Sequence, residues 1–263
     1  TARGGGRIGG LWMSISVGAA VMQTVRTATQ KRLTAHLKTN TITSVRYLFG
    51  MPVAAVYLLA LVVGQAATLP SMSGRFLLYC VAGGLAQIVA TSLLVALFSL
   101  RSFAVGTTYA KTEGFQAAVL GAAFFGERVS KGGLLAVFVG AAGVATISMS
   151  GAGAPLRALT RAFRDRATFY GVASGALFAL AALFIRKASH LLDAGFAVQA
   201  ATTLVVMVGI QATLMGAYIL VVDRSELRAI ARNVRPCMLT GITSAVGSIG
   251  WFTAMALQNA AYV

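Results

Sequence analysis

Acidic residues are scarce in this chain of 263 residues, which holds 6 Asp and Glu against 22 Lys and Arg. Charged residues of both signs make up only 11% of the sequence, whereas an average soluble domain carries about 25%. Hydrophobic residues make up 57%. These proportions predict an integral membrane protein. The net charge of +16 does not indicate nucleic-acid binding, because most basic residues lie in short segments between apolar runs, where anionic lipid headgroups attract them.

Residues that carry most enzyme chemistry are also few. The two cysteines, Cys80 and Cys237, do not make a disulfide framework, and we expect both to be small buried packing residues. The two histidines, His36 and His190, lie in predicted loops and form no metal-ligand cluster. No G-x-S-x-G motif, P-loop or pair of carboxylates on one helix is found. We therefore expect no metal, no cofactor and no enzymatic activity. A membrane enzyme acting on a lipid is the alternative, but it would need clustered Asp, His or Ser.

Eight apolar stretches are long enough to cross a bilayer as helices, for which about 20 residues are needed. None has the strict alternation of a β-barrel strand, so we predict an all-α integral membrane protein. The predicted spans are residues 11–30, 43–63, 75–100, 103–125, 132–149, 167–185, 197–222 and 238–257.

The sequence also repeats itself at a constant spacing of 157 residues. Cys80 and Cys237 form one such pair, and Gly84 and Gly241 form another. Doubled hydrophobic units are typical of transporters built from two related halves. Each unit would contain five helices, an odd number. The second unit would therefore cross the membrane in the opposite direction, as an inverted repeat.

This spacing divides the chain into three parts: a first five-helix repeat over 11–149, a basic amphipathic connector over 150–166, and a second repeat over 167–263. It predicts two further helices near 260–282 and 289–306, so we expect a fragment with eight of ten spans. The connector and residues 224–235 place leucines and arginines on different sides of a helix, which predicts short interfacial helices. Basic loops are the alternative.

The region between residues 103 and 147 holds a small-residue helix with Glu113 near its middle, then Gly126, Glu127 and Arg128, then a helix rich in Gly, Ala and Val. Arg46 begins the second predicted span, in the sequence VRYLFG. These features resemble the EamA-type repeat of the drug/metabolite transporter superfamily. The resemblance implies ten helices in two inverted halves, which move small metabolites, often outward, by alternating access. It also implies the inner membrane of a bacterium.

The chain departs from the family pattern at two positions. Gly114 stands where the family often has proline, and Lys111 is unusual so close to Glu113. The distribution of basic residues between the spans predicts an external N-terminus, whereas the resemblance implies a cytoplasmic one.

Glu113 is the only acidic residue deep in an apolar stretch, about ten residues into its predicted helix and thus near the bilayer midplane. A carboxylate there is costly unless it pairs, protonates or faces water. It could bind a cationic group or exchange a proton; a structural ion pair, with Arg26 as the candidate partner, is the alternative. Lys111, about 200° around the helix, could attract an anionic group or extend along a neighbouring helix.

Two further sets of polar residues are predicted to line a central cavity. Gln23 and Arg26 belong to a polar stripe on the first span, which should face the bundle interior, for binding or for ordinary inter-helix hydrogen bonds. The second set comes from equivalent helices of the two predicted halves. Polar residues of the third span have polar counterparts 157 positions later, in the eighth span. The members of this set are Gln87, Thr91, Ser244 and Ser248, with Trp251 one turn further along, where it could stack on a substrate or simply pack.

The sequence thus predicts a secondary transporter of small metabolites, most plausibly an exporter. The expected partners are a small-molecule solute and the lipid bilayer, with protons and a second copy of the chain as further candidates. A non-transporting membrane scaffold is the remaining alternative, although it would have no need for charges inside the membrane.

Overall fold

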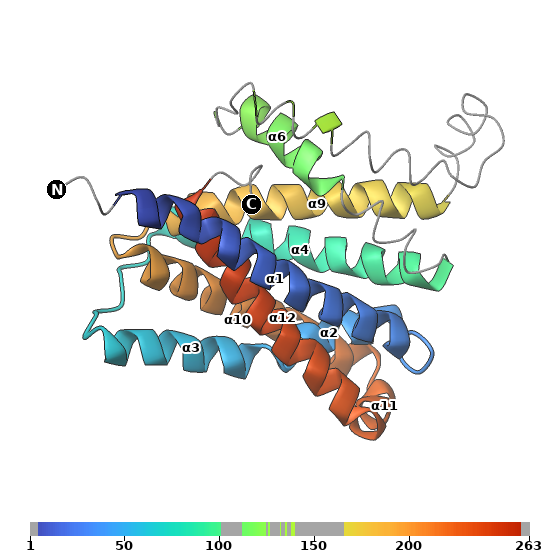
Figure 1. Cartoon of the computed structure of the whole chain (residues 1–263). Helices are drawn as coiled ribbons and strands as arrows, with labels where there is room; N and C mark the ends of the chain where they lie inside the picture. Colours follow the sequence, from blue (N-terminus) through green and yellow to red (C-terminus); the bar gives the residue numbers. More distant parts are fainter. Residues whose placement is uncertain are drawn as a thin grey trace.

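The computed structural model describes residues 5–100, 112–124 and 166–258, together with positions 126, 132, 135, 138 and 139. Every regular element in these parts of the chain is an α-helix (Figure 1). Five helical segments are long and apolar enough to cross a membrane, so the protein is a multi-pass α-helical membrane protein. They are Thr39–Gly64, which contains α2 (Thr39–Leu48) and α3 (Met51–Gly64), then α4 (Gly74–Leu100), α9 (Arg166–Ser189), α10 (Phe196–Val222) and α12 (Val234–Leu257).

The first predicted span lies within α1 (Gly5–Leu33), which is not among these five segments. The fourth predicted span is only partly described, as α6 (Glu113–Phe124). Thr112 lies in a turn before α6, and its carbonyl accepts a hydrogen bond from the Gln116 amide at 3.1 Å. An unbroken helix through residues 103–125 is therefore wrong, since α6 begins at Glu113. The fifth predicted span and the connector lie almost entirely outside the described residues.

Two local features agree with the sequence: the glycine that follows α6 and the short helix before α12. Gly126, just beyond α6, has a φ of 66°, the left-handed conformation that glycine adopts most easily after a helix. The predicted short helix before the last span is present as α11 (Glu226–Arg232).

The second span is divided where α2 meets α3. Pro52, near the start of α3, has no amide hydrogen for the preceding turn, so a continuous helix would lose a hydrogen bond there. Gly50 lies at the break, and a Cβ atom on it would be only 2.6 Å from the Arg46 carbonyl oxygen. On α12, a Cβ atom on Gly241 would be 2.3 Å from the Cβ atom of Phe49. The break in α2–α3 therefore lies directly against the backbone of α12.

The two most extensive helix contacts join helices that are far apart in the sequence. α4 packs most extensively against α9, and α1 packs most extensively against α12. These two pairs are related by the 157-residue spacing, because α9 corresponds to α1 and α12 corresponds to α4. In Figure 1, α1 and α9 run in opposite directions, and so do α4 and α12. The last residues of α4 and α12, Leu100 and Leu257, are themselves 157 positions apart.

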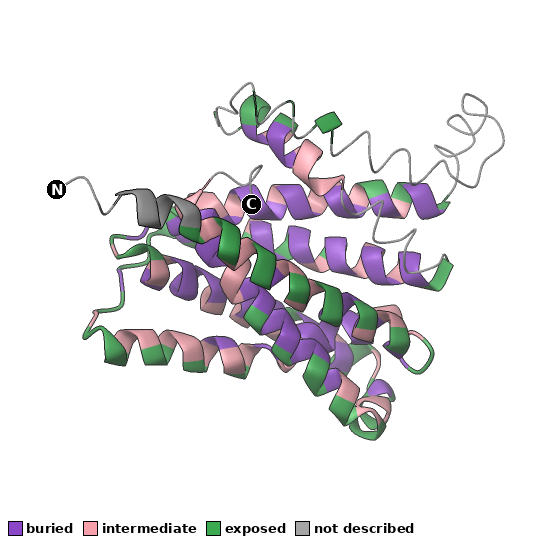
Figure 2. Ribbon diagram, in the orientation of Figure 1, coloured by how far each residue is buried: buried purple, intermediate pink, exposed green. Residues whose placement is uncertain are grey.

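The hydrophobic core lies between α4, α9, α10 and α12, and its largest cluster includes Phe76, Leu183, Leu204, Met207 and Phe252. Exposed apolar residues cover the outer faces, for example on α3, as expected for helices in contact with lipid. Figure 2 shows buried positions on the inward faces of the helices and exposed positions on their outer faces. Cys80 and Cys237 are both buried and free, as predicted.

A basic residue near the end of the first helix in each half donates to a backbone carbonyl of the third helix. The Lys31 ammonium donates to the carbonyl of Phe98, and the Arg186 guanidinium donates to that of Met255 at 2.8 Å. Phe98 and Met255 are 157 positions apart. Both carbonyls lie in the last turns of α4 and α12, where side chains can supplement the hydrogen bonds of the helix.

One end of the bundle has an additional set of polar contacts, at the N-terminus of α2. The Lys38 ammonium forms an ion pair with Asp223 at 2.5 Å, and the Lys38 amide donates to the buried Glu226 of α11 at 3.2 Å. Asn40 donates to the Tyr218 hydroxyl at 2.9 Å. These contacts connect α2 to the end of α10 and to α11.

Candidate functional site

A buried arginine on α2 joins three helices at the centre of the bundle. Arg46 is only 3% exposed. Its Nε atom donates to the Ser244 hydroxyl of α12 at 2.8 Å, and one terminal nitrogen donates to the Thr91 hydroxyl of α4 at 2.6 Å. The guanidinium also lies 5.1 Å from the ring centre of Tyr47. The predicted residues Thr91 and Ser244 are thus brought together, through an arginine that sequence reasoning did not assign to the site.

A glutamine pair continues this polar cluster. The Gln211 amide nitrogen of α10 donates to the side-chain oxygen of Gln87 at 2.9 Å and to the Gly84 carbonyl at 3.1 Å. The Tyr47 hydroxyl donates to the Gln87 carbonyl at 3.2 Å. The Gln211 side-chain oxygen is buried and has no hydrogen-bond partner in the described structure. Gln87 is therefore part of the cluster as predicted, and Gln211 is a further member.

The cluster encloses a small space of about 10 Å³. Ser248, predicted from the repeat, lines this space. The other lining residues are Arg46, Tyr47, Gly50, Gln87, Val208, Ser244 and Ala245. Residues of both halves thus form its wall, and its polar atoms come chiefly from Arg46 and the neighbouring hydroxyl and amide groups. We call these residues, together with Thr91 and Gln211, the central polar cluster.

The polar stripe on α1 faces inward, as predicted. Arg26 is 4% exposed, and Thr27 and Gln30 are also buried. The Nε atom of Arg26 and both side-chain polar atoms of Gln30 are buried without a hydrogen-bond partner in the part of the chain that is described. Arg26 lies on the α1 face that packs against α12, about one turn after Gln23, and it is within electrostatic range of Arg46 and Glu113. Gln23 is half-buried, with its backbone beside Gly247 of α12.

Three other residues predicted to line the central cavity are not found in the central polar cluster among the described residues. Glu113 is half-buried in the first turn of α6, rather than ten residues into a helix. Trp251 is half-buried and packs against the hydrophobic core cluster, so it is not among the residues that line the central space. Lys111 lies outside the described residues.

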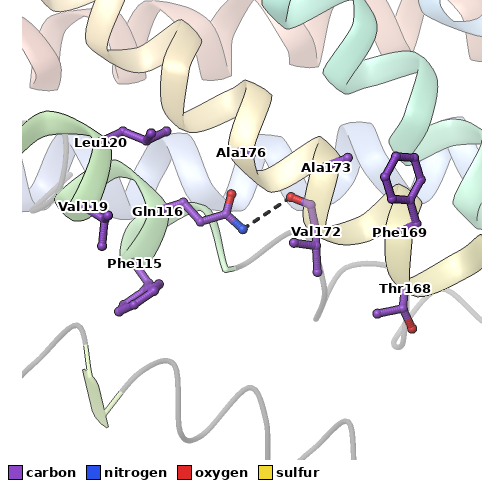
Figure 3. Close-up of a pocket in the computed structure, with 9 residues that line it drawn as sticks. All are labelled: Phe115, Gln116, Val119, Leu120, Thr168, Phe169, Val172, Ala173 and Ala176. Carbon is purple, nitrogen blue, oxygen red and sulfur yellow. Dashed lines mark hydrogen bonds between the residues drawn. The ribbon is translucent and has the colours of Figure 1, made fainter. Parts of the chain in front are cut away.

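A larger cavity of about 370 Å³ lies between α6 and α9. Its walls are mainly apolar, with Phe115, Val119 and Phe169 among the lining residues. Figure 3 shows the Gln116 side chain directed toward the Val172 carbonyl, to which it donates at 3.3 Å. This cavity is at the side of the bundle, away from the central polar cluster, and none of the predicted site residues lines it.

Gln211 could have been assigned to the site from the sequence, because it is a strongly polar residue within an apolar span. No local pattern connects Arg46 to its partners Thr91 and Ser244. In the sequence, Arg46 stands out only through its resemblance to a family position. In comparisons with known proteins, no family model and no curated protein matches this chain.

Proposed function

We propose that this protein is a secondary transporter that moves a small metabolite across the membrane by alternating access. The central polar cluster is the observation that carries this proposal. It is buried between four membrane-spanning segments, and it is built from α2 and α4 of one half and α10 and α12 of the other. Polar and charged groups at such a position are costly, and they commonly mark a substrate pathway.

The helix arrangement supports an inverted repeat around this cluster. Helices 157 residues apart run in opposite directions and exchange packing partners, which is the pattern expected when two similar units are related by a two-fold axis in the membrane plane. We infer that the chain belongs to a ten-helix transporter of the EamA type, on the motifs around Arg46, Glu113 and Gly126. Export of the metabolite and a bacterial inner membrane remain part of this proposal.

Alternating access would then consist of rocking one half against the other. The hydrogen bond from Arg46 to Ser244 joins the two halves, so it would break when the cluster opens. Glu113 is the proposed proton carrier if transport is coupled, because it interacts electrostatically with Arg26. Uncoupled facilitated transport is the alternative.

The proposal can be tested without knowledge of the substrate, by measuring from which side the cluster is reached. The two native cysteines are replaced by alanine, and Ser248→Cys introduces a thiol at the central space. A membrane-impermeant, negatively charged methanethiosulfonate reagent is then added to right-side-out and to inside-out vesicles. A transporter that alternates exposes the thiol to each side in turn, so modification is expected in both preparations.

Ala182→Cys is the matched control, since Ala182 is buried in the hydrophobic core cluster and should react from neither side. Modification of the Ser248→Cys thiol from one side only would indicate a static cavity and contradict the proposal. Absence of modification from both sides would favour a scaffold or a lipid-modifying enzyme.

A further inference from the structure

Two buried guanidinium groups lie close together at the inner face of the first half. Arg26 on α1 and Arg46 on α2 are each at least 96% buried. Gln23, about one turn before Arg26, lies beside Gly247 of α12, which runs in the opposite direction (Figure 1). Ser244, about one turn before Gly247, accepts a hydrogen bond from Arg46, so both guanidinium groups lie at the same level of the bundle. Two like charges in a medium of low dielectric constant repel each other far more strongly than they would in water. Their proximity thus costs free energy unless an anionic group offsets it.

Among the described residues, the groups around this pair do not neutralise it. The Arg46 side chain donates to two neutral hydroxyls, and the Nε atom of Arg26 has no partner within the described chain. Glu113 is the only carboxylate that interacts electrostatically with Arg26 among the described residues. Glu226, the other buried charged residue in these parts of the chain, is bonded to the Lys38 amide at the end of the bundle. Two positive charges therefore face one negative charge.

Additional buried polar atoms beside the pair lack partners. Gln30 lies one helical turn after Arg26, and its amide nitrogen and oxygen are both without a partner in the described residues. The amide nitrogen is a further donor on the same face of α1. Buried polar groups are almost always hydrogen-bonded, so unpartnered donors at one position indicate a ligand that supplies acceptors.

We propose that Arg26 and Arg46 together bind an oxyanion group of the transported substrate, either a carboxylate or a phosphate. This inference rests on the proposed transport function and specifies the class of its substrate. A guanidinium presents several N–H donors in a plane, and both kinds of oxyanion can accept two parallel hydrogen bonds from it.

The space beside Arg46 is about 10 Å³, enough for roughly one water molecule but not for a carboxylate or phosphate group. The site has to widen before an oxyanion enters. An oxyanion that accepts from Arg46 would compete with the Ser244 hydroxyl, which belongs to the other half. Substrate binding would thereby weaken a contact that joins the halves, which links anion binding to opening.

The proposal is tested by calorimetric titration of the purified protein in detergent with inorganic phosphate and with acetate, each at constant ionic strength maintained with sodium chloride. Choline chloride is the cationic control. Binding of phosphate or acetate is expected, with no heat from choline beyond that of sodium chloride. Phosphate alone would identify a phosphate ester as the substrate class, and acetate alone a carboxylate.

The matched variants are taken from the chain's own repeat. Arg46→Thr and Arg26→Leu introduce the residues found 157 positions later, Thr203 and Leu183, both of which are buried in the equivalent helices. Each variant is expected to raise the dissociation constant of the bound anion by about 10-fold or more, as for loss of a charged hydrogen bond. Arg46→Lys should restore part of the affinity. Arg228→Gln, which removes a charge from an exposed position on α11, should leave affinity unchanged.

Circular dichroism and size-exclusion chromatography show whether each variant is folded. Folded Arg46→Thr and Arg26→Leu proteins that bind the anion with unchanged affinity would overturn the proposal. So would the absence of phosphate and acetate binding above the chloride background in the unaltered protein. The thiol-accessibility test of transport is a separate measurement. Two-sided access without anion binding would overturn only this inference. Anion binding with one-sided access would overturn the proposed transport function and leave an anion site that does not serve transport.

Discussion

In the first half of the molecule α1 and α2 each bury an arginine, whereas the positions 157 residues later in α9 and α10 hold Leu183 and Thr203. Leu183 lies in the hydrophobic core, and Thr203 forms hydrogen bonds with Ser189 and the Gln199 carbonyl. The two most extensive helix pairs, α4 with α9 and α1 with α12, are related by the 157-residue spacing, but the charged groups at these positions are not. Apolar burial and helix packing therefore define the shared framework, and a few substitutions on one side define the chemistry of the site.

The largest expected effect on stability comes from Gly241, and its equivalent Gly84 should show almost none. Gly241→Ala places a Cβ atom 2.3 Å from the Cβ atom and 2.7 Å from the carbonyl carbon of Phe49, so the α12 and α2 backbones must separate. We expect a loss of about 3 kcal/mol in the free energy of unfolding, near the upper end for overpacking. Unfolding titrations in mixed detergent micelles measure this change.

Gly84→Ala is the matched control, because the nearest atom to its added Cβ is the flexible Gln211 side chain at 3.6 Å. We expect a change within about 0.5 kcal/mol, since an ordinary contact replaces open space. Equal effects at Gly84 and Gly241 would mean that the close approach of α2 to α12 is not a property of the folded protein.

A smaller effect on stability is expected from the basic side chains that donate to equivalent carbonyls in α4 and α12. Lys31→Met and Arg186→Met each remove a donor to the carbonyl near the end of the third helix, at Phe98 and at Met255. We expect each variant to lose about 1.5 kcal/mol, the lower end for a charged hydrogen bond. Thermal unfolding in detergent compares the two. Arg186 also donates to the Gln258 carbonyl, so its variant should lose at least as much stability as Lys31→Met. No loss in either variant would show that these bonds do not contribute to stability.

The Lys38–Asp223 ion pair distinguishes one end of the bundle from the other, because the positions 157 residues away are Gly195 and Ala66. A hydrogen bond from Lys38, and a second from Ser225, lower the pKa of Asp223 below its ordinary 3.8. The hydrogen bond to Asp223 raises the pKa of Lys38 above 10.5. The stability from Asp223 is therefore present above pH 3.8 and lost as the pH falls through the lowered pKa. The stability contributed by Lys38 is present below pH 10.5 and is lost as the pH rises through the raised pKa of Lys38.

Asp223→Asn should accordingly lower the melting temperature by a constant small amount between about pH 5 and 9, and the difference should shrink at either extreme. Melting curves from below pH 3.8 to above pH 10.5 measure it. Asp193→Asn, at an exposed loop position with no ion pair in the described structure, should show no such window. A difference for Asp223→Asn that does not vary with pH would contradict the electrostatic origin.

The smallest effect is expected in the loop after α3, where Ala66 has a φ of 46°. Its counterpart Asp223 has a φ of −145°, so the strain belongs to the first half alone. Ala66→Gly relieves a conformation that costs an ordinary residue roughly 1 kcal/mol, offset in part by the greater freedom of glycine in the unfolded chain. We expect a net gain of about 0.5 kcal/mol by thermal unfolding. Ala67→Gly, without a positive φ, should be neutral or destabilising.

Much of the framework is predictable because long apolar runs have few alternatives to membrane-spanning helices. The limits of α4, α10 and α12 lie within a few residues of the predictions. The repeat alone also predicts that Gln87, Thr91, Ser244 and Ser248 share one site. The central position of Arg46 is not predictable, because its partners Thr91 and Ser244 are 45 and 198 residues away and no local pattern connects them. The turn at Thr112 escapes prediction for a different reason, since a single threonine does not alter an apolar run.

The polar stripe of α1 has a consequence for the order of events during biosynthesis. Arg26, Thr27 and Gln30 are buried, and α12 is the principal packing partner of their helix. That partner begins only at Val234, so at roughly 5–20 residues per second the ribosome needs on the order of 10–40 seconds to reach it. During this interval the polar side chains of α1 must be hydrated at the membrane surface or held by the insertion machinery. Membrane integration of α1 is therefore expected to be completed late, although α1 is synthesised first among the described helices.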